Sequence, residues 1–288
     1  MERVVLLDGG MGTMLIDCGL KQGQVPELWN LDHPEIVQEV HRQYTSAGAE
    51  AVLTNTFGAS SIKLADSRLS DRACQINYAG AEIALKACPP GTYVIGDIGP
   101  TGKILEPYGD LSESELRDSL ERQVESLLEG GVDALILETQ MDLREAAIGV
   151  AVAKSLTSLP VIVSFTFNKT KRGYFTLMGN SVQAAISGAL DAGADVVGTN
   201  CSLDSAEMKD LVIEIGKHTT APVYAKANAG RAELVGETAS YAQSVEDFMK
   251  SLPEFLEHGV RLIGGCCGTN PSYISALHRL VGRSCHRA

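Results

Sequence analysis

The sequence predicts one α/β domain over residues 1–288, a single (β/α)8 barrel, and three observations support this. Short apolar runs alternate along the whole chain with longer stretches of helical periodicity, which is typical of a parallel sheet covered by helices. The runs number eight, more strands than an open doubly wound sheet of this length usually holds. No linker rich in proline, glycine or serine divides the chain.

The eight predicted strands are, in chain order, Val4–Asp8, Ala51–Asn55, Tyr93–Asp97, Ala134–Glu138, Val161–Phe165, Val196–Asn200, Val223–Lys226 and Arg261–Gly264. Amphipathic stretches long enough for a helix lie between them, among them Pro34–Ala47, Glu113–Glu129, Leu143–Ser155, Ser205–Lys217 and Val245–His258. The even-numbered strands each follow a glycine that would end the preceding helix, at Gly48, Gly131, Gly193 and Gly259. Proline precedes the third, fifth and seventh strands, at Pro90, Pro160 and Pro222. This alternation favours four paired units that close into a barrel.

The chain is acidic, with a net charge of -12 at pH 7 and an isoelectric point near 5.0. Binding to a phosphate backbone needs a basic face, so we expect neither nucleic acid nor an anionic membrane as a partner. We also expect no signal peptide and no membrane span, because the first apolar stretch, Val4–Leu7, is far too short. Seven cysteines in such a chain predict reduced thiols or metal ligands, and hence a cytoplasmic protein.

The carboxyl ends of the predicted strands carry polar and glycine-rich runs, and the active site of such a barrel lies at those ends. Apolar residues would be expected at these positions if they only packed in the core, so we expect these polar runs to bind a ligand. They are Asp8–Thr13, Thr54–Phe57, Gly96–Thr101, Glu138–Thr139, Asn200–Ser202, Asn228–Gly230 and Gly264–Gly268.

Three cysteines fall at two of these ends: Cys201 follows the sixth strand, and Cys266 with Cys267 follows the eighth. Alternate strands of a sheet lie about 10 Å apart, whereas two thiolates on one zinc ion lie roughly 3.8 Å apart. The loops must therefore lean inward. We expect the glycines at 264, 265 and 268 to permit the backbone angles that this requires.

Three thiolates would leave one position of a tetrahedral zinc ion open, as catalytic zinc sites require. A substrate thiol entering that position would be held as a thiolate, which is the nucleophilic form. Two structural interpretations stay open, in which these cysteines are small buried core residues or form a vicinal disulfide. The other four cysteines, Cys18, Cys74, Cys88 and Cys285, are interpreted as buried core residues.

The strand-end runs resemble, in the same order and over nearly the whole chain, those of the homocysteine S-methyltransferase family, most closely the homocysteine-binding module of cobalamin-dependent methionine synthase. The resemblance implies a zinc-bearing TIM barrel that methylates the sulfur of homocysteine to give methionine. It places the zinc ligands at Cys201, Cys266 and Cys267.

The same resemblance implies where the amino-acid portion of the substrate binds. Asp8, Gly9 and Gly10 fall on the loop whose backbone holds that portion, and Glu138 falls on the acid that meets its ammonium. From its position alone, Glu138 could equally pair with a surface lysine or arginine. The remaining matches are positions in or behind the cavity wall, at Thr54, Asn200 and Asn228. One departure is Ala227, where related sequences often have proline.

In the implied mechanism a methyl group passes in line to the zinc-bound thiolate, and no catalytic residue is expected beyond that thiolate. The sequence contains no Asp-x-His-x-x-Gly run of the kind that ligates cobalt, and no second barrel for a methyl-folate. We therefore expect the donor to be a methylated corrinoid (cobalamin) carried by a separate corrinoid protein. S-methylmethionine or betaine is the alternative donor. An alternative of another class is a non-catalytic subunit that binds homocysteine and zinc within a larger methyltransferase assembly.

Overall fold

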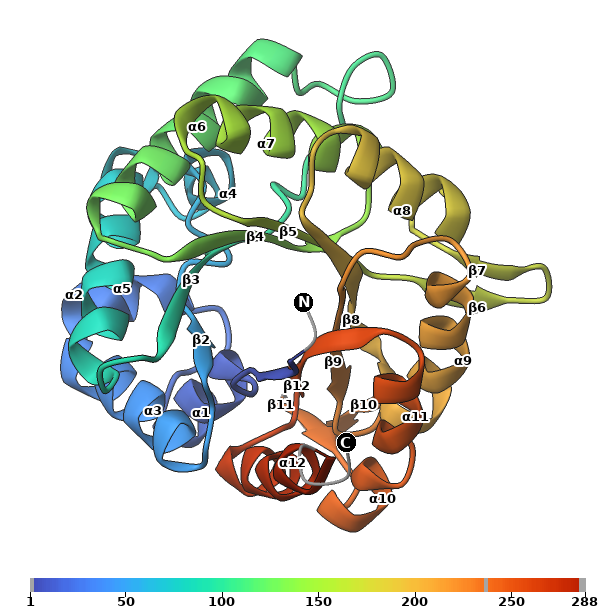
Figure 1. Ribbon diagram of the computed structural model, residues 1–288. Coiled ribbons are helices and arrows are strands. Elements are labelled where there is room, and N and C mark those ends of the chain that lie inside the picture. Colours follow the sequence, from blue (N-terminus) through green and yellow to red (C-terminus); the bar gives the residue numbers. More distant parts are fainter. Residues whose placement is uncertain (1–2, 236–237, 285–288) are drawn as a thin grey trace.

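The computed structural model describes residues 3–235 and 238–284. Its main sheet has eight parallel strands in the order β1, β12, β9, β8, β5, β4, β3, β2. A parallel bridge between Leu7 and Ala51 joins the two ends of that order, so the sheet closes, and the helices surround it (Figure 1). The predicted (β/α)8 TIM barrel is confirmed. That residues 1–288 form one domain stays a prediction.

The barrel strands lie where the sequence predicts them, with ends that differ by a few residues. They are β1 (Val5–Leu6), β2 (Ala51–Leu53), β3 (Tyr93–Ile98), β4 (Ala134–Gln140), β5 (Val161–Phe165), β8 (Val196–Asp204), β9 (Val223–Asn228) and β12 (Val260–Gly265). Buried side chains from all around the barrel, among them Leu53, Ile136 and Tyr224, pack into one cluster. This cluster fills the barrel interior, so a ligand must bind at an end of the barrel.

Four of the five predicted helices are single helices in the structure, at α3 (Pro34–Ser46), α6 (Glu113–Glu129), α7 (Leu143–Leu156) and α9 (Ser205–Gly216). Ser112 and Glu115 form a capping box at the start of α6. The predicted helix Val245–His258 is instead divided into α10 (Val245–Met249) and α11 (Leu252–Glu257). Pro253 lies in the first turn of α11 and has no N–H to donate to the carbonyl of Met249, so one continuous helix is unfavourable.

Further elements occupy the segments that the sequence analysis left unassigned. The helices are α1 (Met11–Asp17), η1 (Pro26–Leu28), α2 (Trp29–Asp32), α4 (Ser61–Ala65), η2 (Ser70–Arg72), α5 (Ala73–Ala87), α8 (Val182–Asp191) and α12 (Pro271–Ser284). Two antiparallel hairpins extend from the barrel, β6 (Asn168–Thr170) with β7 (Gly173–Phe175), and β10 (Ala232–Val235) with β11 (Thr238–Tyr241). Within the described residues, no helix is both long and apolar enough to cross a membrane.

The glycines that precede the even-numbered barrel strands all have positive φ, between 89° and 107°, as expected for helix-ending residues: Gly48, Gly131, Gly193 and Gly259. The expectation of burial was wrong for two of the other cysteines. Cys18 and Cys74 are exposed, Cys74 because α5 buries a different face, and Cys88 is half-buried. Cys285 lies outside the described residues.

Candidate metal and amino-acid site

A cavity of about 450 Å³ lies at the carboxyl ends of the barrel strands. Most of the residues that the sequence predicts for the site line it, together with several that it does not predict. The polar and sulfur-bearing ones are Asp8, Met11, Thr13, Asp17, Glu27, Thr54, Asn55, Asp97, Glu138, Thr139, Cys201, Lys226, Tyr241, Cys266 and Cys267. Gly9 and Gly10 line it as well.

The three predicted cysteines converge on one point of this cavity. The Sγ atoms of Cys201, Cys266 and Cys267 all lie within 4.8 Å of one another, and those of Cys201 and Cys267 are 3.8 Å apart. Two thiolates bound to the same zinc ion with bonds of about 2.3 Å have roughly this separation. The donor set therefore fits a tetrahedral zinc ion that retains one further position.

Strained backbone on β8 directs Cys201 inward. Cys201 and Ser202 both have left-handed φ values, 62° and 60°, which non-glycine residues rarely adopt. The pairing of β8 with β9 shifts register between Asn200 and Asp204, so the strand departs from regular pairing at this point. A conformation that costs of order 1–3 kcal/mol per residue persists only where the surrounding structure holds it.

On β12 the glycines act differently from the prediction. Of the three, Gly268 alone has a left-handed φ, 80°. Gly264 and Gly265 are needed for close packing instead, because an added Cβ would lie 2.6 Å from the carbonyl oxygen of Asp8 and 2.3 Å from Oγ1 of Thr269, respectively. These contacts bring the cysteine loop against the loop that follows β1.

The crowding of the sulfurs raises their pKa values. The pKa of Cys201 rises to about 12, mainly because its thiol hydrogen-bonds with Cys266. The pKa of Cys267 also rises to about 12, with the hydrogen bond to Cys201 as the largest cause. Several adjacent thiolates are unfavourable without a positive charge among them, and a divalent cation would supply that charge.

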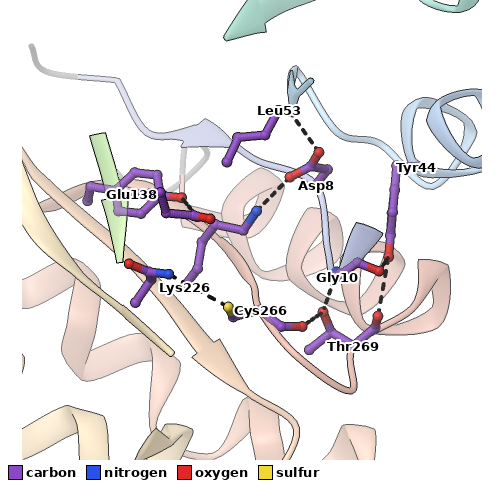
Figure 2. A network of polar contacts seen from close by, with 10 residues as sticks. Asp8, Gly10, Tyr44, Leu53, Glu138, Lys226, Cys266 and Thr269 are labelled. Atoms are coloured by element: carbon purple, nitrogen blue, oxygen red, sulfur yellow. Dashed lines mark hydrogen bonds and ion pairs between the residues drawn. The ribbon is translucent and has the colours of Figure 1, made fainter. Parts of the chain in front are cut away.

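Thr269 joins the cysteine loop to the loop after β1 (Figure 2). Its hydroxyl accepts a hydrogen bond from the backbone N of Gly10 at 3.1 Å and donates one to the carbonyl of Cys266 at 2.7 Å. The hydroxyl of Tyr44 donates to the carbonyls of Gly10 and Thr269. Gly9 has no room for a side chain, since an added Cβ would lie 2.7 Å from the Tyr44 ring.

A buried ion pair lies beside the cysteines. Lys226 Nζ is 2.7 Å from Asp8 Oδ1, and the two side chains are only 4% and 1% exposed. Asp8 Oδ2 accepts a hydrogen bond from the backbone N of Leu53, so both its oxygens are engaged. Burial lowers the pKa of Lys226, but the carboxylates of Asp8 and Glu138 more than reverse this and raise it. Lys226 is therefore a buried cation among carboxylates (Figure 2).

Glu138 is buried at the end of β4, and Oε1 accepts a hydrogen bond from the Tyr224 hydroxyl at 2.8 Å. Burial raises its pKa, while Lys226 opposes the rise. Burial, and then the charge of Glu138, raise the pKa of Asp97 well above its usual range. Glu138 is thus a buried residue that lines the cavity, and it forms no ion pair with the other residues that the structure describes.

The three predicted wall positions are buried, and two of them support other residues of the site. Thr54 Oγ1 accepts a hydrogen bond from the backbone N of Asp97 at 2.9 Å. Asn200 bonds the backbone and hydroxyl of Thr139, and its Nδ2 is 3.8 Å from Cys266 Sγ. Asn228 is 4% exposed, and its Oδ1 has no partner within the described residues.

Sequence reasoning did not single out Lys226, Asp97, Tyr224 or Thr269 as site residues. Lys226 carried a signal, since a lysine ended an otherwise apolar strand. Asp97 was part of a polar strand end but had no assigned role. In the sequence, Tyr224 has the pattern of a core residue and Thr269 that of a loop residue. Only their contacts in the structure identify them as part of the site.

Comparison with known proteins gives a consistent result. The chain is 32% identical over 300 residues to methionine synthase from Mycobacterium leprae (strain TN), covering 98% of this chain and 24% of that protein. It is 31% identical over 291 residues to methionine synthase from Mycobacterium tuberculosis (strain ATCC 25618 / H37Rv), covering 95% of this chain and again 24% of the relative. The chain therefore spans about a quarter of the length of these relatives.

Among solved structures, the metallated form of the homocysteine methyltransferase MmuM from Escherichia coli superposes with a TM-score of 0.79, at 24% identity and over 96% of each chain. This similarity supports the barrel fold. The family model for homocysteine S-methyltransferase matches residues 5–281. With a match of this extent, the chain belongs to the homocysteine S-methyltransferase family.

Proposed function

We propose that this protein transfers a methyl group to the thiol of homocysteine and forms methionine, with a zinc ion held by Cys201, Cys266 and Cys267. The observation that carries the proposal is the convergence of three sulfur atoms within 4.8 Å at the edge of a carboxylate-lined cavity. Free cysteines in a metal site need a reducing environment, so we place the protein in the cytoplasm.

The protein's own residues would orient the sulfur ligands and the substrate. Zinc, when bound, would supply a fourth coordination position that takes the substrate sulfur as a thiolate. Asn200, fixed by Thr139, lies against Cys266 Sγ and restricts its orientation. Thr269 holds the carbonyl of Cys266 from the opposite loop. Homocysteine needs no separate general base here, because its thiol proton leaves when the sulfur binds the metal.

The amino-acid end of homocysteine would bind among Glu138, Asp8, Gly9 and Gly10. A buried carboxylate facing the cavity suits an ammonium group, because a charge-assisted hydrogen bond is stronger where water is excluded. A cavity of about 450 Å³ accommodates an amino acid. The methyl group would then be transferred in line, with the sulfur–carbon bond forming as the donor–methyl bond breaks and its electron pair stays with the donor.

For the donor we propose a methylated corrinoid carried by a separate protein. The methionine synthase relatives are about four times as long as this chain, which supports a division of the reaction among several modules. A corrinoid ring with its nucleotide is larger than the cavity, so the methyl group would be presented at its mouth.

Zinc removal tests this function. Reduced, zinc-loaded protein with homocysteine and methylcobalamin should form methionine, detected by mass spectrometry. A chelator should abolish the reaction, and added zinc should restore it. Methionine formation at the same rate in the metal-free protein would contradict the proposal.

A further inference from the structure

Asp97 is held in place by its backbone and not by its side chain. Its N–H donates to Thr54 Oγ1 at 2.9 Å, and its carbonyl accepts from Thr56 Oγ1 at 2.7 Å. The two threonine hydroxyls lie 2.6 Å apart, so they form one chain of hydrogen bonds behind β3. The backbone of Asp97 is therefore fixed before any ligand binds.

The carboxyl group of Asp97 is buried and incompletely satisfied. The residue is 5% exposed and lines the cavity. Its Oδ1 is closed to solvent and has no hydrogen-bond partner within the described residues. Most buried polar atoms have a partner, and leaving one without costs about 1–3 kcal/mol, more for a charged group. Because the residue lines the cavity, a small rotation of its carboxyl group would expose this acceptor to a ligand that donates to it.

Four other carboxylates line the cavity. Asp17 is exposed, and the three buried ones each have at least one oxygen engaged; Glu27 Oε1, for example, accepts a hydrogen bond from the backbone N of Gly58. Asp8 has both oxygens occupied, by Lys226 and by the backbone N of Leu53. Glu138 Oε1 is bonded to the Tyr224 hydroxyl. Lys226, the buried cation that lines the cavity, is thus committed to Asp8. Asp97 and Glu138 together lack a second positive charge, and an ammonium group carries that charge with three donors.

We propose that Asp97 is a second acceptor for the substrate ammonium, shared with Glu138, and that this pair selects α-amino thiols over thiols without an amino group. This inference rests on the proposed function, because it assigns a further contact to the same substrate. Lys226 contributes indirectly, since it neutralises Asp8 and leaves the mutually repelling carboxyl groups of Asp97 and Glu138 without a cation of their own.

Calorimetry with two thiols tests the proposal on the zinc-loaded protein. The thiols are L-homocysteine and 4-sulfanylbutanoic acid, which has the same thiol and carboxylate but no amino group. The Asp97→Asn variant should bind homocysteine about 10- to 100-fold more weakly, the range for a hydrogen bond between charged groups. Its affinity for 4-sulfanylbutanoic acid should change less than about threefold, because neither the zinc site nor the carboxylate contacts are altered.

Asp133→Asn is the matched control. Asp133 precedes β4 at its amino end and bonds the backbone N of Val94, so this variant should bind both thiols as the unmodified protein does. Ligand-free Asp97→Asn should melt at the same temperature as the unmodified protein or higher, since it removes a buried carboxyl group whose ionisation is disfavoured by burial and by Glu138.

Two outcomes would overturn the inference. If Asp97→Asn weakens the binding of both thiols equally, or of neither, Asp97 does not recognise the amino group. The proposed function would then stand without this contact. If the unmodified zinc-loaded protein binds neither thiol, the proposed function fails and this inference fails with it.

Discussion

At the scale of single residues, the three cysteines proposed to hold zinc are brought together by unusual backbone conformations. Cys201 reaches the other two sulfurs through consecutive left-handed residues, and Cys266 and Cys267 reach it from a strand end where side chains would not fit. Within the part of the chain that the structure describes, no other cysteine, histidine or carboxylate belongs to this group.

The first prediction follows from this lack of a spare ligand. Reduced protein should contain about one zinc ion per chain, and Cys201→Ser, Cys266→Ser or Cys267→Ser should each lose it. Elemental analysis measures the content. Cys74→Ser is the control, since Cys74 is an exposed residue of α5 and should not affect the metal. Full zinc retention in any two of the three variants would refute the assignment.

The second prediction concerns Glu138. Glu138→Gln keeps the shape of the side chain but removes the charge, so homocysteine affinity should fall by about 1.5 to 3 kcal/mol. Zinc content should be unchanged. Binding should still release close to one proton near pH 7, because a thiol with a pKa of about 8.5 must enter as the thiolate. Calorimetry in buffers of different ionisation enthalpy counts that proton. Unchanged homocysteine affinity, or loss of zinc, would place the ammonium elsewhere.

At the scale of elements, the hydroxyl of Thr269 is one of the links between the loop after β1 and the loop after β12. Thr269 is fully buried and bonds both Gly10 and Cys266. Thr269→Val removes the hydroxyl and leaves the backbone N of Gly10 without its partner, while the carbonyl of Cys266 keeps its bond to the backbone N of Thr269. The free energy of unfolding should therefore fall by about 1–3 kcal/mol. Zinc should also transfer to a competing chelator at a lower chelator concentration. Thr269→Ser retains the hydroxyl and should behave nearly as the unmodified protein; equal losses in the two variants would show that packing matters instead.

Helix α3 contains a histidine that makes stability depend on pH. His41 is fully buried, and neither ring nitrogen has a partner within the described residues. Burial lowers its pKa from 6.5 to about 4, with Asp8 opposing the change. Below pH 6.5 the unfolded chain binds a proton that the folded chain does not accept until about pH 4. The free energy of unfolding should therefore fall as pH falls through this window, by about 3 kcal/mol in total.

Urea unfolding at several pH values, on the unmodified protein and on His41→Leu, isolates that contribution. Burial raises the pKa values of Glu27 and Glu145, and these shifts change the free energy of unfolding with pH in the opposite direction. Subtracting the unfolding free energy of His41→Leu from that of the unmodified protein at each pH cancels the contribution of these glutamates. Parallel pH profiles for the two proteins would mean that His41 is protonated in the folded state or makes no contribution.

At the scale of the whole molecule, the barrel interior is filled and the cavity lies at one end. A methyl donor must therefore arrive from outside. The protein should be inactive with methyl-folate, active with free methylcobalamin, and faster with a methylated corrinoid protein. Comparison of kcat/KM values across a donor panel measures this. A higher kcat/KM with S-methylmethionine or betaine would contradict the corrinoid proposal and favour those donors.

The sequence alone determined the architecture and named the three cysteines, because both depend on local signals. Strand and helix periodicity, helix-ending glycines and polar strand ends repeat along the chain, and parallel strands bring their carboxyl ends to one face. The broken helix at Pro253 could have been predicted by the same reasoning.

Only the tertiary structure decided how charge is distributed in the cavity. Asp8 lies 218 residues before Lys226 in the sequence, and nothing local indicates that the two form a buried pair. The same holds for Glu138 with Tyr224, and for Thr269 with Gly10. Periodicity records which face of an element is apolar, whereas the partner of a buried charge depends on which distant strands become neighbours when the barrel closes.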